Sequence, residues 1–195
     1  MYDNTSIGII EQVYLSPGIH KRELSKQLNL GMPSIEYSLR KINRLLKKQK
    51  SGNQIKYFLD YAKPDLTPAL TVVEYSRIEN LPAKIRISVR EILKGLGEKP
   101  VISLIFGSYA SRKYTQESDI DIFLVFQKPN VKNIEDTAKK ISMMTNTRIN
   151  PVYLDYNGFR ESFHNPTKQF FKNIRKDKIL LTGIEWWRQL NEEET

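Results

Sequence analysis

The most constraining feature of this chain is an apolar run that carries a carboxylate. Residues 120–126, IDIFLVF, have the composition of a buried strand, and Asp119 stands directly before them. Side chains alternate between the two faces of a strand, so Asp119 and Asp121 point to one face while Ile120 and Ile122 point into the core. Two neighbouring carboxylates repel each other and are costly to bury unless a cation offsets their charge.

A divalent cation is the counter-charge that this pattern favours. Hard oxygen ligands suit Mg²⁺, so we predict Asp119 and Asp121 as metal ligands. Upstream, Gly107 ends a predicted strand and Ser108 begins a helix or turn. Glycine lets the backbone approach a phosphate closely, and a helix N-terminus offers free N–H groups to anions. A phosphate cradle and a metal-binding pair in one strand–helix–strand unit suit phosphoryl or nucleotidyl transfer.

The C-terminal half alternates between strand and helix patterns. Apolar runs predict strands at 101–106, 120–126, 148–154 and 179–181. Helical patterns occupy 134–144 and 157–174, the second interrupted near Pro166, and residues 108–114 form a short helix or turn. The order predicts a small α/β domain with a mixed sheet over residues 100–195, and an α+β class for the whole chain.

The N-terminal part has a different organisation. Residues 6–15 and 20–28 read as helices, and a third helix begins at Ser34, with Ile35, Leu39, Ile42 and Leu46 at helical spacing. A turn at 51–53 leads into a strand at 54–59. This order predicts a winged helix–turn–helix over residues 1–62 and is similar to the MarR- and ArsR-like DNA-binding families. Residues 63–99 are predicted as a helical linker, for which a connecting role is favoured over dimerisation.

The charge balance favours polyanionic partners. The chain carries 31 Lys and Arg against 22 Asp and Glu, a net charge of +9. Five of the basic residues, Arg40, Lys41, Arg44, Lys47 and Lys48, are expected on or near the exposed side of the third helix, where the alternative is a solvated face. The predicted contacts with double-stranded DNA are Ser34, Tyr37, Ser38, Lys41, Arg44 and Lys56.

Composition also limits the location and the metal chemistry. The chain has no cysteine, which excludes disulfides and thiolate metal sites and fits a reducing compartment. The apolar runs are too short to cross a bilayer, and the first residues lack the pattern of a signal peptide. We therefore expect a cytoplasmic protein without membrane contact. The two histidines, His20 and His164, are expected as surface or cap residues.

One stretch supports a resemblance to a known family. Gly107-Ser108, ten residues and Asp119-Ile120-Asp121, within "GSYA" and "SDIDIFLV", resemble the nucleotidyltransferases of the DNA polymerase β superfamily, in particular the minimal nucleotidyltransferase group. The resemblance runs from about residue 101 to 183 and includes "NPVYLD" and "ILLTG".

The resemblance implies roles for individual residues. Asp119 and Asp121 would hold one or two Mg²⁺ ions against the triphosphate of an NTP. Gly107 and Ser108 would cradle its phosphates, and Arg112 and Ser118 are predicted to bind the nucleotide as well. An acceptor hydroxyl would then attack the α-phosphorus and release pyrophosphate.

The chain departs from the family pattern at two places. Ser111-Arg112 follows "GSYA" where many relatives have a glycine. Active relatives usually place a third carboxylate on a later strand, where this chain has Asn150 and Pro151. Asp155, at the end of the same strand and on the opposite face from Asn150, is the candidate third acid.

The sequence therefore favours two functions from different classes. The first is a Mg²⁺-dependent enzyme that transfers NMP from an NTP to an unknown acceptor hydroxyl. The second is a transcriptional regulator whose nucleotidyltransferase-like domain binds nucleotide with little or no catalysis. A homodimer, and a small helical protein partner of the kind found in toxin–antitoxin modules, are further expectations, the second by family analogy.

Overall fold

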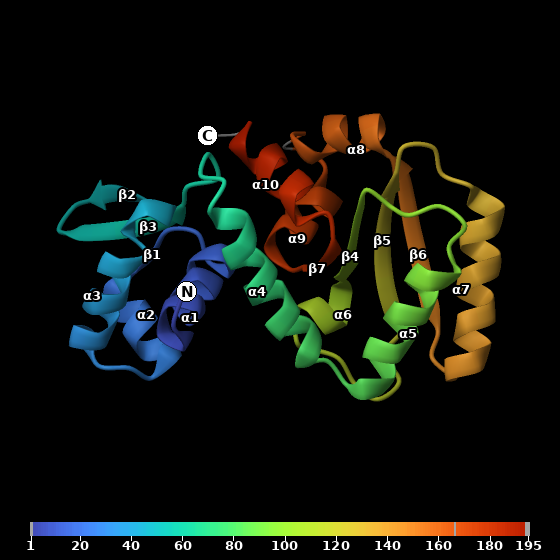
Figure 1. Ribbon diagram of the computed structural model, residues 1–195, viewed down its shortest axis with the longest axis horizontal. Helices are drawn as coiled ribbons and strands as arrows, with labels where there is room; N and C mark the ends of the chain where they lie inside the picture. Colours follow the sequence, from blue (N-terminus) through green and yellow to red (C-terminus); the bar gives the residue numbers. More distant parts are fainter. Residues whose placement is uncertain (1, 166, 194–195) are drawn as a thin grey trace. The chain divides into compact units, whose positions relative to one another are not determined.

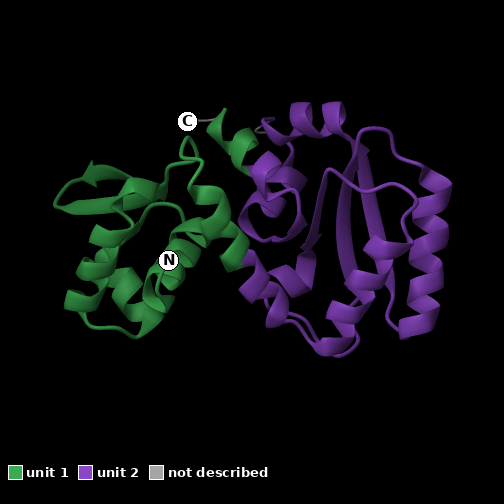
Figure 2. Cartoon of the chain, viewed as in Figure 1, with its two compact units in different colours: residues 1–73, 188–195 green, residues 74–187 purple. Residues whose placement is uncertain are grey.

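The computed structural model describes residues 2–165 and 167–193 (Figure 1). The chain divides into two compact units, residues 1–73 with 188–195 (unit 1) and residues 74–187 (unit 2) (Figure 2). The boundaries fall within α4 (Leu66–Glu79) and α10 (Ile184–Glu192). Among the described residues, no helix combines the length and the apolar character needed to cross a membrane.

Unit 1 consists of short helices and a three-stranded antiparallel sheet with the strand order β1-β3-β2. Its core is formed by apolar side chains of the helices, including Ile9, Leu24 and Ile35. Its elements before α4 are α1 (Asn4–Leu15), β1 (Ile19–His20), α2 (Lys21–Leu28), α3 (Met32–Lys41), the 3-10 turn η1 (Asn43–Leu45), β2 (Leu46–Ser51) and β3 (Gln54–Leu59).

Polar side chains define where the first two helices of unit 1 begin. Asp3 caps α1 by accepting a hydrogen bond from the Ser6 N–H at 2.8 Å. His20 caps α2 because its Nδ1 accepts from the Glu23 N–H at 3.2 Å, while the Glu23 carboxylate accepts from the His20 N–H at 3.2 Å. This capping box confirms the expectation that His20 is a cap residue.

The third helix is shorter than its apolar spacing predicts. α3 ends at Lys41, and Lys47 and Lys48 belong to β2, so the expectation that they lie on a helix is wrong. β2 pairs with β3 from Leu46↔Leu59 to Ser51↔Gln54, around a turn in which Gly52 has φ +58°. Leu46 is buried in this strand as it would have been in a helix, so apolar spacing alone could not distinguish the two. Pairing with β3 overrides the local helix propensity.

Unit 2 is built on a mixed four-stranded sheet with the strand order β6-β5-β4-β7. β5 and β6 are parallel and the other pairs are antiparallel, which agrees with the predicted α+β class. Its strands are β4 (Ile102–Phe106), β5 (Ile120–Phe126), β6 (Ile149–Asp155) and β7 (Ile179–Thr182). Its complete helices are α5 (Ala83–Gly95), α6 (Gly107–Ala110), α7 (Val131–Thr145), α8 (Tyr156–Phe163) and α9 (Gln169–Lys176).

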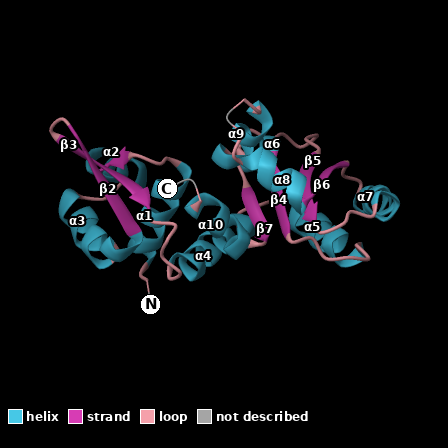
Figure 3. Ribbon diagram, turned by 90° about the horizontal axis from the view of Figure 1, so that it is seen from above, coloured by secondary structure: helices cyan, strands magenta, loops and turns pink. Residues whose placement is uncertain are grey.

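Helices cover both faces of this sheet (Figure 3). Ile120 and Ile122 of β5 belong to one apolar cluster with Ile85 of α5 and Ile134 of α7. α5, expected as part of a linker, is thus part of the core of unit 2. Phe123 points to the other face and contacts aromatic side chains of α8 and α9. The expected break near Pro166 falls between α8 and α9, and Pro166 itself lies outside the described residues.

One lysine in the core of unit 2 makes its stability depend on pH. Lys178 is buried, its Nζ donates to the Arg175 carbonyl at 2.8 Å, and it lies 4.9 Å from the centre of the Trp187 ring. Burial lowers the pKa of Lys178 to about 7. An unfolded chain, with a lysine pKa of about 10.4, therefore binds a proton that the folded chain releases.

We expect the free energy of unfolding to rise with pH between about 7 and about 10 because of Lys178, by about 1 kcal/mol per pH unit. Lys178→Met should lack this contribution. The measurement is denaturant unfolding of both proteins at pH 7.0 and 9.5. The difference in stability between variant and wild type should shrink toward high pH, and a pH-independent difference would contradict the expectation.

Candidate functional site

The two aspartates of β5 meet an asparagine from the neighbouring parallel strand. Asp121 is in register with Asn150 of β6 and with Phe106 of β4. The Asn150 Nδ2 donates to Asp119 Oδ2 and to Asp121 Oδ1, at 3.3 Å in each case. Asn150 thus lies between the two carboxylates, and we call Asp119, Asp121 and Asn150 the carboxylate site.

Gly107 brings the backbone against this site. It begins α6 with φ +71°, and a Cβ at this position would lie 2.3 Å from Asp121 Oδ2. Only glycine combines this backbone conformation with this close approach. The structure therefore places the strand-to-helix turn, with Ser108 as its next residue, directly beside Asp121.

Two further residues shape the edge of the site. Ser118 organises the loop before Asp119: its Oγ accepts from the Thr115 N–H at 2.8 Å, and its carbonyl accepts from the Tyr109 hydroxyl at 3.3 Å. The Arg148 Nε lies 3.7 Å from Asp119 Oδ2. Sequence reasoning missed Arg148, although its position two residues before Asn150 on the same strand path was an available signal.

The structure does not bring Asp155 to the carboxylate site. Asp155 pairs with Phe126, five positions along β5 from Asp121, a separation of about 16 Å at the usual rise per residue. Its side chain accepts from the Gly158 N–H at 2.9 Å and caps α8. The expectation that Asp155 supplies the third acid is therefore corrected, because its carboxylate has a local structural role.

Arg112 lines a cavity with residues of α4, α6 and β7, and its backbone has φ +59°. Neither Asp119 nor Asp121 is among the described residues of that lining. The role of Arg112 in nucleotide binding stays a prediction.

The carboxylate site fits a cation that is shared with a ligand. Within residues 2–165 and 167–193, no three His, Asp or Glu side chains gather into a metal-binding group. Asp119 and Asp121 supply two hard oxygen donors, and rotation of the Asn150 amide would present its Oδ1 as a third. Mg²⁺ prefers six oxygen ligands and commonly binds through one or two carboxylates together with phosphates and water. The donor set is therefore suited to Mg²⁺ bound with a phosphorylated ligand.

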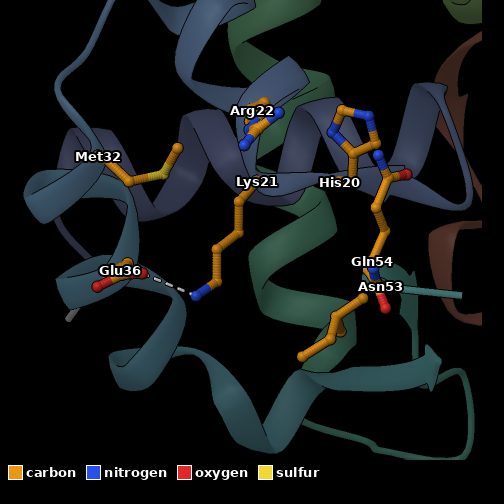
Figure 4. A pocket seen from close by; sticks show the side chains of 8 residues that line it. His20, Lys21, Arg22, Met32, Glu36, Asn53 and Gln54 are labelled. Carbon is orange, nitrogen blue, oxygen red and sulfur yellow. Dashed lines mark hydrogen bonds and ion pairs between the residues drawn. The ribbon is translucent and has the colours of Figure 1, made fainter. Parts of the chain in front are cut away.

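Unit 1 has a separate concave surface between the start of α2, α3 and the β2–β3 turn (Figure 4). It encloses about 380 Å³, and Figure 4 shows Lys21 extending toward Glu36, with which it forms a 2.8 Å ion pair. Two further recesses share lining residues with it. The basic side chains that line the three are Lys21, Arg22, Arg40, Lys48 and Lys50, and we call them the basic recess.

The residues predicted to contact DNA are not among the described residues that line the three recesses. Ser34 and Tyr37 are exposed on α3, and Lys56 is half-buried on β3. Ser38 is buried, so its side chain faces the core and cannot contact a base without rearrangement.

Two predicted DNA contacts are neutralised within unit 1. Lys41 pairs with Asp3 at 2.8 Å, and this hydrogen bond lowers the pKa of Asp3 to about 2. Arg44 pairs with Asp65 at 3.1 Å. Neither lines the basic recess. Sequence reasoning missed Arg22 and Lys50, because their recesses form only when the β2–β3 turn folds.

Comparison with known proteins agrees with the geometry of unit 2. Residues 88–182 match the family model of the polymerase beta nucleotidyltransferase domain, just under half of the chain. A solved structure described as a toxin–antitoxin with AMP-PNP is similar at 16% identity and a TM-score of 0.42, over 58% of this chain and 83% of that one. No curated protein matched. The family match covers the part of the chain that carries the carboxylate site and supports a nucleotidyltransferase-like domain there.

Proposed function

On the premise that residues 88–182 form a nucleotidyltransferase-type domain, we propose that the carboxylate site binds an NTP through Mg²⁺ and transfers its nucleotidyl group to a hydroxyl. The observation that supports this is the pairing of Asp119 and Asp121 around Asn150 beside Gly107. In the transfer, the acceptor oxygen forms a bond to the α-phosphorus, the bond from that phosphorus to the bridging oxygen breaks, and pyrophosphate leaves. Mg²⁺, when bound, would offset the charge of the leaving group.

Each residue of the site has a part in this proposal. Asp119 and Asp121 hold the cation, and Asn150 keeps the two carboxylates together in its absence. Gly107 allows the backbone at the start of α6 to approach the phosphates. Arg148, beside Asp119, adds positive charge at an exposed edge of the site.

Among the residues that the structure describes, the site has no group placed to accept the proton of the attacking hydroxyl. Asn150 occupies the position next to the pair, and an amide cannot act as a base. Asp155 is too distant. We therefore propose that nucleotide binding is the main property of the site and that transfer is slow.

Calorimetric titration of ATP, GTP, CTP and UTP, with Mg²⁺ and with EDTA, tests the proposal. We expect at least one nucleotide to bind more tightly with Mg²⁺, and slow label transfer from that nucleotide in a cell extract. If each of the four nucleotides gives the same binding heat with Mg²⁺ as with EDTA, the proposed Mg²⁺-dependent function is refuted.

Asn150→Asp should strengthen Mg²⁺ binding, since it adds a third carboxylate next to the pair without changing side-chain size. We expect about tenfold tighter Mg²⁺ and faster nucleotidyl transfer, together with lower stability in EDTA because three carboxylates repel one another. The measurements are Mg²⁺ calorimetry and transfer of labelled nucleotide. Asp155→Asn is the matched control, since asparagine also caps helices. Equal Mg²⁺ affinity of Asn150→Asp and wild type would contradict the assigned site.

A second function is favoured by the basic recess. We infer that unit 1 is a winged helix–turn–helix that binds double-stranded DNA, with phosphates along the recess. The support is the order of three helices and a hairpin, and the cations gathered from α2, α3 and β2. A homodimer, a small helical protein partner and a cytoplasmic location stay predictions.

Lys48→Ala with Lys50→Ala should weaken DNA binding at low salt and reduce the slope of log K against log salt by about 2, because two phosphate contacts are lost. Anisotropy of a labelled duplex across a salt series measures this. The matched control is Lys41→Ala with Arg44→Ala, which removes two cations that already pair with Asp3 and Asp65. If both double variants lose DNA affinity equally, DNA binding depends on the net charge of the protein and not on the basic recess.

A further inference from the structure

Unit 2 contains a cavity whose described lining does not include the residues of the carboxylate site. It encloses about 510 Å³. Its lining comes from the end of α4, the α4–α5 connection, α6 with the following loop, and the start of β7. We call it the arginine cavity. The residues that line it are Arg77, Asn80, Leu81, Tyr109, Ala110, Arg112, Tyr114 and Ile179. In the described part of the chain, this lining contains two guanidinium groups and no carboxylate.

A buried ion pair forms part of the cavity wall. Arg77 is 5% exposed and pairs with Glu74 at 3.0 Å. The Arg77 Nε is buried and has no hydrogen-bond partner among the described residues. An anion in the cavity would supply an acceptor for this N–H group.

An aromatic pair forms another part of the wall. Tyr109 and Tyr114 stack with their ring centres 4.6 Å apart and an interplanar angle of 22°. Tyr109 is buried and held by its hydrogen bond to the Ser118 carbonyl, whereas Tyr114 is 38% exposed. Because the buried Tyr109 ring holds the Tyr114 ring in place, the accessible face of Tyr114 can stack against a planar group.

The second arginine of the lining is held in an uncommon backbone conformation. Arg112 has φ +59°, and the other non-glycine residues with positive φ in the described part of the chain are both asparagines, which tolerate it better. Strained residues of this kind concentrate at sites of function. Here the strain is found at an arginine that lines the cavity.

We propose that the arginine cavity binds a mononucleotide-sized organic phosphate, with its phosphate at Arg77 and Arg112 and its planar group on Tyr114. Guanidinium groups bind phosphate through paired, charge-assisted hydrogen bonds. A volume of about 510 Å³ lies within the range of small-molecule sites. Because no carboxylate lines the cavity, this binding does not need Mg²⁺. The site goes beyond the function proposed for Asp119 and Asp121.

The test is calorimetry on the full chain in EDTA, with AMP, adenosine, ribose 5-phosphate and inorganic phosphate as probes. We expect AMP to bind, adenosine and ribose 5-phosphate to bind at least tenfold more weakly, and inorganic phosphate to bind most weakly. Arg112→Gln and Tyr114→Ala should each weaken AMP binding about tenfold or more. These positions are exposed, so the test avoids disturbing the buried Arg77–Glu74 pair.

Two control proteins separate this proposal from the proposed function. Lys113→Ala, at the exposed neighbour of Arg112, should leave AMP binding in EDTA unchanged, and so should a variant with Asp119→Asn and Asp121→Asn. AMP binding in EDTA without Mg²⁺-dependent NTP binding would count against the proposed function alone. If no probe binds in EDTA, or if AMP binding is lost in the aspartate variant and kept in Arg112→Gln and Tyr114→Ala, the cavity proposal is overturned.

Discussion

Asp121→Asn is expected to weaken Mg²⁺-dependent nucleotide binding about a hundredfold or more and to abolish detectable transfer. Asp121 is held between Phe106 and Asn150 in the middle of three strands and beside the backbone of Gly107, so no other side chain of the site can take its place. The substitution removes one of the two negative charges that we propose hold the cation, without a change in side-chain shape. A hundredfold loss corresponds to about 2.7 kcal/mol of binding free energy.

The measurement is calorimetry with the NTP that binds wild type, in Mg²⁺. Asp136→Asn is the matched control, since it removes an exposed carboxylate of α7 in the same unit. Stability in EDTA should be unchanged or higher in Asp121→Asn, because the repulsion between the two carboxylates is relieved. Wild-type affinity in a correctly folded Asp121→Asn protein would exclude the carboxylate site as the place where the nucleotide binds.

Gly183→Ala is expected to lower the free energy of unfolding of unit 2 by about 3 kcal/mol or more. Gly183 follows β7 with φ +80°, a conformation that costs an alanine about 1–2 kcal/mol. A Cβ there would also lie 2.3 Å from the Val101 carbonyl oxygen and 2.9 Å from the Ile102 Cα. These are backbone atoms at the start of β4, which cannot move without disturbing the sheet.

Fluorescence during denaturant unfolding measures this effect, since both tryptophans, Trp186 and Trp187, lie in unit 2. Gly97→Ala is the control within the same unit, because the nearest atom to a Cβ there is 3.5 Å away. We expect Gly97→Ala to unfold close to wild type. Equal midpoints for Gly183→Ala and wild type would mean that the close approach of β7 and β4 is not required.

Much of unit 2 could be predicted from the sequence because its signals are local. The run 120–126 is a strand with the predicted bounds, and the helix and strand order that follows agrees with the apolar pattern. Gly107, Asp119 and Asp121 lie within fifteen residues of one another, and strand alternation alone places both carboxylates on one face. The family match of residues 88–182 agrees with the resemblance stated from these residues.

Contacts between distant segments could not be predicted in the same way. The register of the parallel strands β5 and β6 decides that Asn150, and not Asp155, lies at the carboxylate site. The pairing of β2 with β3 decides that Lys48 belongs to a hairpin and not to a helix. Both depend on the pairing of strands, and periodicity within one segment carries no information about its partner.

By itself the sequence determined most strands and helices of unit 2 and the placement of its two aspartates on one strand face, because apolar periodicity and residue type act over a few positions. Only the tertiary structure decided that Lys41 and Arg44 form ion pairs within unit 1 and that Asp155 lies away from the carboxylate site. It also decided that Arg77 and Arg112 line the same cavity. The physical reason is that these properties depend on distances between segments far apart in the chain, which are set by the packing of the folded units.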